Sequence, residues 1–330
     1  MSGLDPAAAA CLDLARHPAV TVHLRPRLAG FTTFQLGGLC PVLLDCATED
    51  ALRTTLDHLD DRGLRWRLIG GGSNLLVSDA GLSEVLVRYA SSSAAPKIED
   101  GFLDVSAATP LDVVAEWCAR QGWEGLTFAT GIPGTVGGAL AGNAGAFGYD
   151  VGSRLVELII REPDGRRRQA GPAEFGFAYR SSGIPQRRVV VLRARWTMER
   201  ASPETLLAER RRILDLRRAR HPDWRTLPTA GSFFRNVAPT SAAGRRQAAG
   251  WYLEQAGAKA MREGGAAVFD RHANIIVKAA DFCTADDVHR LALRMAEAVF
   301  NRFGLALEPE VQRWGVFRPG PSPDRDEVGT

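Results

Sequence analysis

The chain has 330 residues, of which 45% are hydrophobic and 24% charged, and its formal net charge is +3. This composition is typical of an ordinary globular protein, and the charge is too small to indicate a nucleic-acid partner. No apolar run reaches the roughly 18 residues of a membrane span, and the N-terminus lacks the basic and long apolar regions of a secretory signal. Five cysteines without a C-x-x-C pair favour reduced thiols in the cytoplasm.

The first part of the chain predicts a β-α-β unit. Thr48 is placed to cap a helix over 49–61, whose first turn is acidic. A turn, Gly70-Gly71-Gly72-Ser73-Asn74, separates the last two strands of the unit. Strands are expected at 41–46, 65–70 and 84–88.

The middle of the chain is expected to be rich in strands. The dipeptides Asp100-Gly101 and Asp164-Gly165 are typical of tight hairpin turns. Between them, Thr109 as N-cap and Pro110 at the first position predict a helix that ends at Gly122. The strands are expected at 96–99, 102–106, 155–161, 166–169 and 188–197.

The last part of the chain predicts alternating helices and strands. Ser202-Pro203 begins a long helix over 203–220, which must end before Pro222. Thr284 and Asp287 resemble a capping box for a helix that reaches Phe303. The other elements are a helix at 246–256, strands at 265–269, 273–278 and 305–311, and a frayed tail over 318–330. Together the segments predict an α+β protein of three lobes.

The long helix carries the densest basic cluster of the chain. We interpret this cluster as a solvated helix face, with a contribution to holding phosphates as the alternative. Its members are Arg210, Arg211, Arg212, Arg217, Arg218 and Arg220.

Residues 125–148 hold eight glycines and five alanines, and none of them is charged. Glycine costs roughly 0.5–1 kcal/mol relative to alanine inside a regular element, so eight of them serve something other than packing. A flexible linker would be polar, whereas this stretch carries Leu126, Phe128 and Leu140. The stretch is therefore predicted to form a glycine-lined wall against a large flat ligand.

Two glycine-rich loops, 70–74 and 131–145, offer backbone N–H groups that no side chain obstructs, and such loops can bind a diphosphate. Neither loop has a known fingerprint. Leu75 stands where the motif G-x-G-x-x-G needs its third glycine, and the chain has no Gly-Lys pair for a P-loop. From these residues alone, a dinucleotide is one possibility among several.

Six segments in consistent order resemble the UDP-N-acetylenolpyruvoylglucosamine reductases, also called UDP-N-acetylmuramate dehydrogenases, over nearly the whole chain. They are Thr32-Thr33-Phe34 with Gly37-Gly38, GGGSNLL at 70–76, GIPGTVGGALAGNAGAFG at 131–148, FAYRSS at 177–182, GSFFRN at 231–236 and LEPEV at 307–311. No tyrosine lies between 180 and 231, so the chain is similar to the shorter subtype that lacks a tyrosine loop over the substrate.

The resemblance implies the FAD-binding fold of the vanillyl-alcohol-oxidase (PCMH) type. Residues 1–90 with 305–330 would form the first FAD-binding lobe, 91–200 the second, and 201–304 an α/β substrate-binding lobe. The cofactor would be noncovalent FAD. The residues expected to bind it are Gly70, Gly71, Gly72, Ser73, Asn74, Gly131, Ile132, Gly134, Gly138 and Asn143.

The resemblance also implies a reaction, in which NADPH reduces FAD and the flavin reduces the enolpyruvyl ether of UDP-N-acetylglucosamine enolpyruvate. The product, UDP-N-acetylmuramate, serves peptidoglycan synthesis. Ser232 matches the proton donor, and Arg180 and Glu310 match the residues that orient and stabilise the enolate. An always-charged arginine suits a carboxylate whose charge grows in the transition state. Tyr179, Arg235 and Asn236 are expected to bind the substrate. A cytoplasmic monomer without a metal, nucleic-acid or membrane partner is expected.

The chain departs from the family pattern mainly in the third lobe. Arg235 replaces a lysine, a change that is not neutral at a diphosphate, and Phe269 could fill substrate space. The remaining departures are Gln35, Leu39-Cys40, Val237 and Lys278. An alternative is therefore a FAD oxidoreductase of the same fold with another substrate, for instance in secondary metabolism. A flavin-storing or nucleic-acid-binding protein without catalysis is disfavoured by the catalytic motifs. His272 is expected to be a hydrogen-bonded structural histidine rather than a general base.

Overall fold

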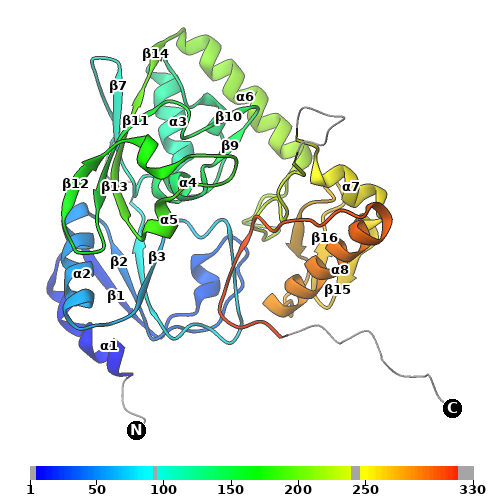
Figure 1. Ribbon diagram of the computed structural model, residues 1–330, viewed down its shortest axis with the longest axis horizontal. Helices are drawn as coiled ribbons and strands as arrows, with labels where there is room; N and C mark the ends of the chain where they lie inside the picture. The colour runs from blue at the N-terminus through cyan, green and yellow to red at the C-terminus, as the bar shows by residue number, and fades with distance from the viewer. Residues whose placement is uncertain (1–4, 92–94, 239–245, 319–330) are drawn as a thin grey trace. The chain divides into compact units, whose positions relative to one another are not determined.

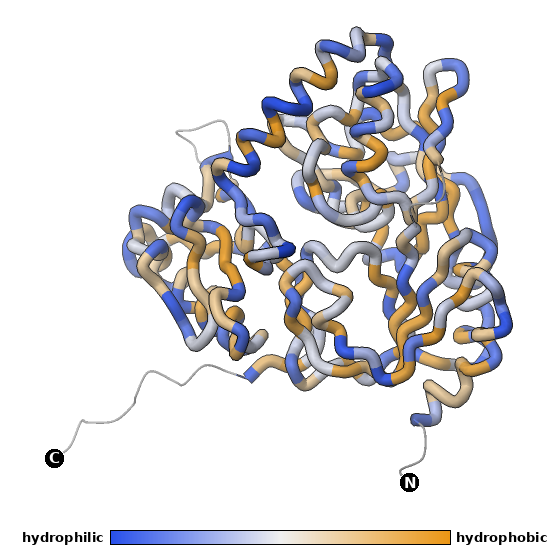
Figure 2. Tube along the Cα trace, turned by 180° about the vertical axis from the view of Figure 1, so that it is seen from behind, coloured by the Kyte–Doolittle hydropathy of each residue, from blue (hydrophilic) through white to orange (hydrophobic). Residues whose placement is uncertain are grey.

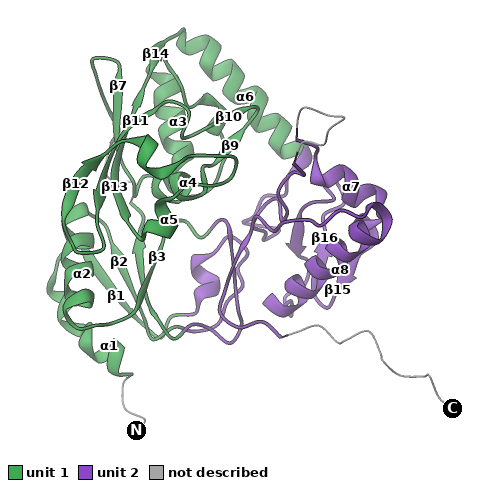
Figure 3. Cartoon of the chain, viewed as in Figure 1, with its two compact units in different colours: residues 1–26, 40–72, 83–219 green, residues 27–39, 73–82, 220–330 purple. Residues whose placement is uncertain are grey.

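The structure is a computed structural model that describes residues 5–91, 95–238 and 246–318 (Figure 1). The chain forms two compact units, of which unit 1 comprises residues 1–26, 40–72 and 83–219, and unit 2 comprises 27–39, 73–82 and 220–330 (Figure 3). Each unit has its own buried apolar cluster. Figure 2 shows the hydropathy of each residue along the chain, with hydrophobic residues in both units.

Unit 1 begins with a four-stranded sheet in the order β1-β2-β5-β3. Strands β2, β5 and β3 run parallel, and β1, which the sequence did not predict, pairs antiparallel with β2. Helix α2 (Glu49–Asp61) begins as predicted, because the Thr48 hydroxyl accepts a hydrogen bond from the Ala51 N–H at 3.1 Å. The strands are Val20–Leu24, Val42–Cys46, Trp66–Ile69 and Val85–Tyr89, and α1 (Pro6–Ala10) and η1 (Leu12–Arg16) precede them.

A second, antiparallel sheet of unit 1 has the order β12-β11-β13-β7-β6. Both predicted hairpins are confirmed. Asp100 and Gly101 have φ values of 50° and 78°, and Gly165 has 86°, as tight turns between such strands require. The strands are Arg167–Ala170, Leu155–Arg161, Val190–Thr197, Phe102–Ser106 and Lys97–Glu99.

Helix α3 (Leu111–Arg120) corrects one prediction, because Pro110 rather than Thr109 occupies the N-cap position and no side chain caps the helix. The reason is tertiary. The Thr109 carbonyl accepts the Val136 N–H at 2.9 Å, so this segment is held against the glycine-rich stretch. The short elements of the region are β8 (Trp123–Glu124), η3 (Thr127–Ala129), α4 (Val136–Gly142), β9 (Gly145–Ala146), β10 (Tyr149–Asp150), η4 (Pro172–Phe175), α5 (Ile184–Arg187) and β14 (Glu199–Arg200).

Helix α6 (Pro203–Arg220) has the predicted bounds. The interpretation of its arginines as a solvated face is wrong at Arg210, which is only 8% exposed. Its guanidinium lies 2.6 Å from an Asp112 carboxylate oxygen and 3.2 Å from one of Glu116. Arg211 and Arg218 are exposed, as expected.

Unit 2 contains a three-stranded antiparallel sheet, β15-β16-β17, whose strands are Arg262–Glu263, Ala266–Val268 and Ile276–Lys278. Helix α8 (Ala285–Phe303) begins at the predicted capping box, where Thr284 and Asp287 exchange hydrogen bonds, and Gly304 follows its end. Strand β4 (Leu75–Val77) pairs in parallel with β18 (Gln312–Trp314). Helix α7 (Ala249–Gln255), η2 (Leu28–Phe31) and η5 (Ala258–Ala260) complete the unit.

The predicted strand at 305–311 is wrong. The segment makes only an isolated bridge, between Phe234 and Pro309, and β18 begins at Gln312. Pro309 has no N–H to donate, so the segment cannot form a regular ladder there. Of the predicted tail, residues 319–330 lie outside the described residues.

All five cysteines are buried and free, which confirms the expectation of unpaired thiols. Burial raises the pKa of Cys118 and Cys283 to about 12, so these thiols are unreactive. None of the helices in the described ranges has the length and hydropathy of a membrane-crossing segment.

Candidate functional site

The two predicted glycine loops meet in unit 1. A Cβ atom built on Gly71 would lie 2.8 Å from the Cα of Gly134, and one on Gly70 would lie 2.3 Å from the Thr135 hydroxyl oxygen. Neither glycine has a positive φ. Close approach of the two loops, rather than backbone conformation, therefore requires glycine at 70 and 71.

Several N–H groups of the 131–145 loop are already hydrogen-bonded. The Gly131 N–H donates to Asp112 at 2.7 Å, the Ile132 N–H to the Ala129 carbonyl at 3.0 Å, and the Gly138 N–H to Thr135 at 3.3 Å. These residues shape the wall of the site with their backbone. The assignment of these residues as cofactor contacts stays a prediction.

An arginine that was first interpreted as part of a basic helix face lies against this wall. The Arg217 Nε donates to the Thr130 carbonyl at 2.7 Å, and a Cβ on Gly131 would lie 2.8 Å from the Arg217 Cδ. Burial lowers the pKa of Arg217, with smaller effects from Asp112 and Arg180. The stretch 125–148 has no charged residue of its own and lies beside this cation, and the Asp112 carboxylate that bonds Gly131 is already paired with Arg210. The surface therefore fits a flat, anionic ligand.

Arg180 lies in a tight turn of unit 1 between Ala178 and Ser181. The Ala178 N–H donates to the Ser181 carbonyl at 3.0 Å, and the Ser181 N–H donates to the Ala178 carbonyl at 3.1 Å. Arg180 has φ +54°, a left-handed conformation that costs a non-glycine residue about 1–2 kcal/mol. Its Nη2 donates to the Gly145 carbonyl at 2.8 Å, and its guanidinium lies 5.3 Å from the centre of the Tyr179 ring. Strained residues of this kind are concentrated at functional sites.

Ser232 lies in unit 2 in an extended segment, residues 231–236, which we call the serine segment. A buried asparagine that the sequence did not single out holds it. Asn274, 2% exposed, donates to the Phe234 carbonyl at 2.8 Å and accepts the Phe234 N–H at 2.9 Å. The Asn274 carbonyl also accepts the Phe233 N–H at 2.8 Å. Of the stretch DRHAN at 270–274, the sequence singled out only His272.

Glu310 is held beside the serine segment within unit 2, in an irregular stretch rather than on the predicted strand. Its N–H donates to the Phe233 carbonyl at 2.8 Å, and its carbonyl accepts the Asn74 Nδ2 at 3.0 Å. The structure therefore brings the segments of Ser232 and Glu310 together and joins them to the first glycine loop through Asn74. Arg180 belongs to unit 1.

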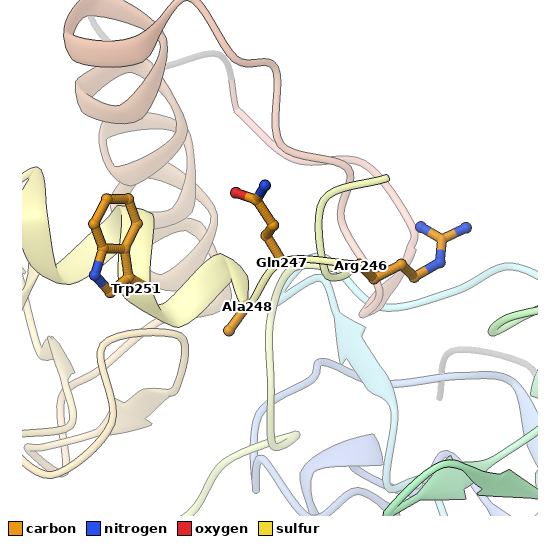
Figure 4. A pocket seen from close by; sticks show the side chains of 4 residues that line it. All are labelled: Arg246, Gln247, Ala248 and Trp251. Carbon is orange, nitrogen blue, oxygen red and sulfur yellow. The ribbon is translucent and has the colours of Figure 1, made fainter. Parts of the chain in front are cut away.

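The predicted substrate residues Arg235 and Asn236 are the last two residues of the serine segment. The Arg235 N–H donates to the Glu308 carbonyl at 2.9 Å. The Asn236 carbonyl accepts from the Arg246 guanidinium at 3.2 Å. Beside it lies a hollow of about 460 Å³ (Figure 4). The hollow is lined by Arg246, Gln247, Ala248 and Trp251. Trp251, on helix α7, is 55% exposed, and no local pattern marked it.

Three of the residues that depart from the family pattern can be placed within unit 2. Phe269 packs with Ile275 and Val277 in a small buried cluster of unit 2. Its ring therefore belongs to a core and does not fill an open hollow. Lys278 and Gln35 line a second hollow, of about 440 Å³.

His272 is hydrogen-bonded, as expected. Its Nδ1 accepts the Asn274 N–H at 3.2 Å, which fixes the ring as an acceptor at this atom. Burial lowers the pKa of His272, with a smaller effect from Arg220.

Comparison with known protein families identifies the class of fold to which the chain belongs. A family model described as "FAD binding domain" matches residues 41–171. The fold and these loops define an α+β protein with the FAD-binding fold of the vanillyl-alcohol-oxidase (PCMH) type. A model described as "UDP-N-acetylenolpyruvoylglucosamine reductase, C-terminal domain" matches residues 222–314.

Proteins that are similar to this one over most of its length identify the family. A UDP-N-acetylenolpyruvoylglucosamine reductase from Halalkalibacterium halodurans is 34% identical over 89% of this chain and 94% of its own length. A second such reductase, from Symbiobacterium thermophilum, is 35% identical over 94% of this chain and 98% of its own length. A crystal structure of the reductase from Thermus caldophilus superposes with a TM-score of 0.73 and 29% identity, covering 90% of this chain and 99% of that one. The chain belongs to the UDP-N-acetylenolpyruvoylglucosamine reductase family.

Proposed function

We propose that this chain is an NADPH-dependent flavoenzyme that reduces UDP-N-acetylglucosamine enolpyruvate to UDP-N-acetylmuramate for peptidoglycan synthesis. The observation that carries the proposal is the similarity to reductases of this name over 89% or more of the chain. The geometry supports it, because the segments of Ser232 and Glu310 are hydrogen-bonded to one another.

The residues of the glycine loops fit FAD. Gly70, Gly71 and Gly134 allow two backbones to touch, and the stretch 125–148 beside them has no acidic residue of its own. The Asp112 carboxylate, which accepts the Gly131 N–H, is paired with Arg210. We propose that these glycines, with Ser73 and Asn74, hold the cofactor noncovalently. When bound, FAD supplies the hydride chemistry, and the protein supplies position and charge.

The other residues have separate roles in the proposed reaction. The Arg180 guanidinium binds the substrate carboxylate and stabilises the negative charge that develops next to it. The Ser232 hydroxyl donates its proton to the carbon beside that carboxylate. Glu310 supports the same charge, and Tyr179, Arg235 and Asn236 orient the nucleotide sugar.

We also propose the three-lobe division predicted from the sequence and a monomeric enzyme of the cytoplasm, where its nucleotide reductant is available. Light scattering of the purified protein tests the monomer. The alternative of another substrate is not favoured, because the similar proteins that span the chain carry the same reductase name.

The two half-reactions of the purified protein test the function. In a stopped-flow instrument, NADPH should bleach the bound flavin, and about millimolar UDP-N-acetylglucosamine enolpyruvate should restore its colour. Ser232→Ala should leave the first step intact and slow the second by about 10²–10⁴-fold, the range of a general acid. Ser83→Ala, at an exposed serine, is the matched control. A wild-type flavin that the substrate does not reoxidise would contradict the proposal.

A further inference from the structure

The turn that carries Arg180 is hydrogen-bonded to the C-terminal end of helix α4 and the residues that follow it. Three hydrogen bonds connect residues 178–182 with residues 141–145. The Ser182 hydroxyl donates to the Ala141 carbonyl at 2.8 Å, and the Arg180 guanidinium donates to the Gly145 carbonyl at 2.8 Å. The third bond comes from Asn143, whose Nδ2 donates to the Ala178 carbonyl at 2.7 Å. All these residues belong to unit 1.

Asn143 is well suited to this contact. It is 1% exposed, and it ends helix α4 with φ +45°, a conformation that asparagine tolerates better than most residues. Its Oδ1 accepts the Gly152 N–H at 3.0 Å, so both ends of the amide are bonded to backbone. The partners fix which atom is the donor, because a carbonyl can only accept and an N–H can only donate.

The Ala178 carbonyl accepts twice, from Asn143 and from the Ser181 N–H that closes the turn. The asparagine therefore bonds the atom on which the turn depends, two residues before Arg180. Because the left-handed backbone of Arg180 is unfavourable by itself, the turn needs bonds of this kind to persist.

We propose that Asn143 is a positioning residue for Arg180. Its amide fixes the turn between Ala178 and Ser181 and thereby sets the place of the guanidinium, and the side chain is not a ligand of the cofactor. The inference rests on the proposed function, in which Arg180 binds the substrate carboxylate. It also explains why an asparagine, rather than glycine, follows the glycines of α4, since glycine would supply the backbone conformation without the two bonds.

The test is a double-mutant cycle on the full-length protein. Asn143→Asp keeps the shape and the acceptor for Gly152 but removes the donor to Ala178. In the wild-type background it should slow reoxidation of the reduced flavin by the enolpyruvyl substrate about tenfold, with reduction by NADPH and flavin content unchanged. In an Arg180→Lys background it should slow reoxidation less than about twofold, because the two residues act together. Asn301→Asp, on an exposed face of α8, is the matched control.

A second measurement does not depend on turnover. Amide hydrogen exchange of the fragment 176–183 should rise about tenfold in Asn143→Asp, while strand β13 stays protected. If Asn143→Asp does not fold, Asn143→Gly keeps the left-handed backbone and deletes both side-chain bonds.

The outcomes distinguish a failure of the positioning role of Asn143 from a failure of the proposed function. Equal losses in both backgrounds, or unchanged exchange in the fragment, would overturn the positioning role. Raised exchange without any kinetic coupling would also overturn it, since Asn143 would then be structural only. Failure of the wild-type flavin to be reoxidised would contradict the proposed function instead, and the exchange result would then decide for or against Asn143 alone.

Discussion

The contact between the two glycine loops makes Gly71→Ala the most informative substitution. The new Cβ would lie 2.8 Å from the Gly134 Cα and 3.5 Å from the N and C atoms of Gly134. Carbon atoms prefer separations of about 3.5–4.0 Å, so the loops must part by roughly 0.7–1.2 Å. Since the obstacle is backbone, no side chain can rotate to relieve it. Overpacking of this kind costs about 1–3 kcal/mol.

We expect this cost to appear mainly in cofactor binding. The free protein can relieve the clash by parting the loops, whereas a diphosphate held by both loops draws them together. A cost of about 1–3 kcal/mol corresponds to a roughly 5- to 150-fold higher Kd for FAD. Titration of the apoprotein with FAD, followed by flavin fluorescence, measures this change.

Gly171→Ala is the matched control, because Gly171 has φ −88° and no atom within 4 Å of the built Cβ. It should leave the Kd for FAD and the thermal midpoint unchanged. The reasoning would be refuted if Gly71→Ala bound FAD as tightly as this control. A lower thermal midpoint with an unchanged Kd would show that the loops contact each other without holding the cofactor.

Three further predictions concern stability, and urea unfolding measures each. Asn274→Ala deletes two hydrogen bonds to the backbone of the buried Phe234 and should lower the free energy of unfolding by about 2–4 kcal/mol, whereas Asn301→Ala should change it little. Arg210→Met removes the ion-pair partner that Asp112 and Glu116 share, although Glu116 keeps Arg120, and should cost about 1–3 kcal/mol. Arg211→Met, at an exposed position, should stay within about 0.5 kcal/mol. Burial first, and then a neighbouring arginine, lower the pKa of His289 in the folded state. The unfolded chain therefore binds a proton at this site more readily, so the free energy of unfolding should fall as the pH decreases below about 6.5. His289→Gln should reduce the dependence of the free energy of unfolding on pH in this range. An equal dependence in the variant would contradict this assignment to His289.

The sequence was sufficient wherever the deciding partner is a few residues away. Thr48 and Thr284 begin helices as predicted, because each accepts a hydrogen bond from an N–H three residues later. Asp100-Gly101 forms its turn because the two residues tolerate left-handed backbone. The six motifs likewise established the family without a structure, since residue type and order carry that information.

The tertiary structure alone decided which of several similar side chains is buried and what it bonds. Arg210 reaches Asp112 over 98 positions in the chain, and Asn274 reaches Phe234 over 40. No local pattern separates Arg210 from its exposed neighbours, because all of them suit a helix equally well. Asn143 was predicted to contact the cofactor, and only the structure shows that its Nδ2 donates to a backbone carbonyl 35 positions away. The physical reason is the same in each case: a buried polar group must find its partner wherever the fold brings one within reach.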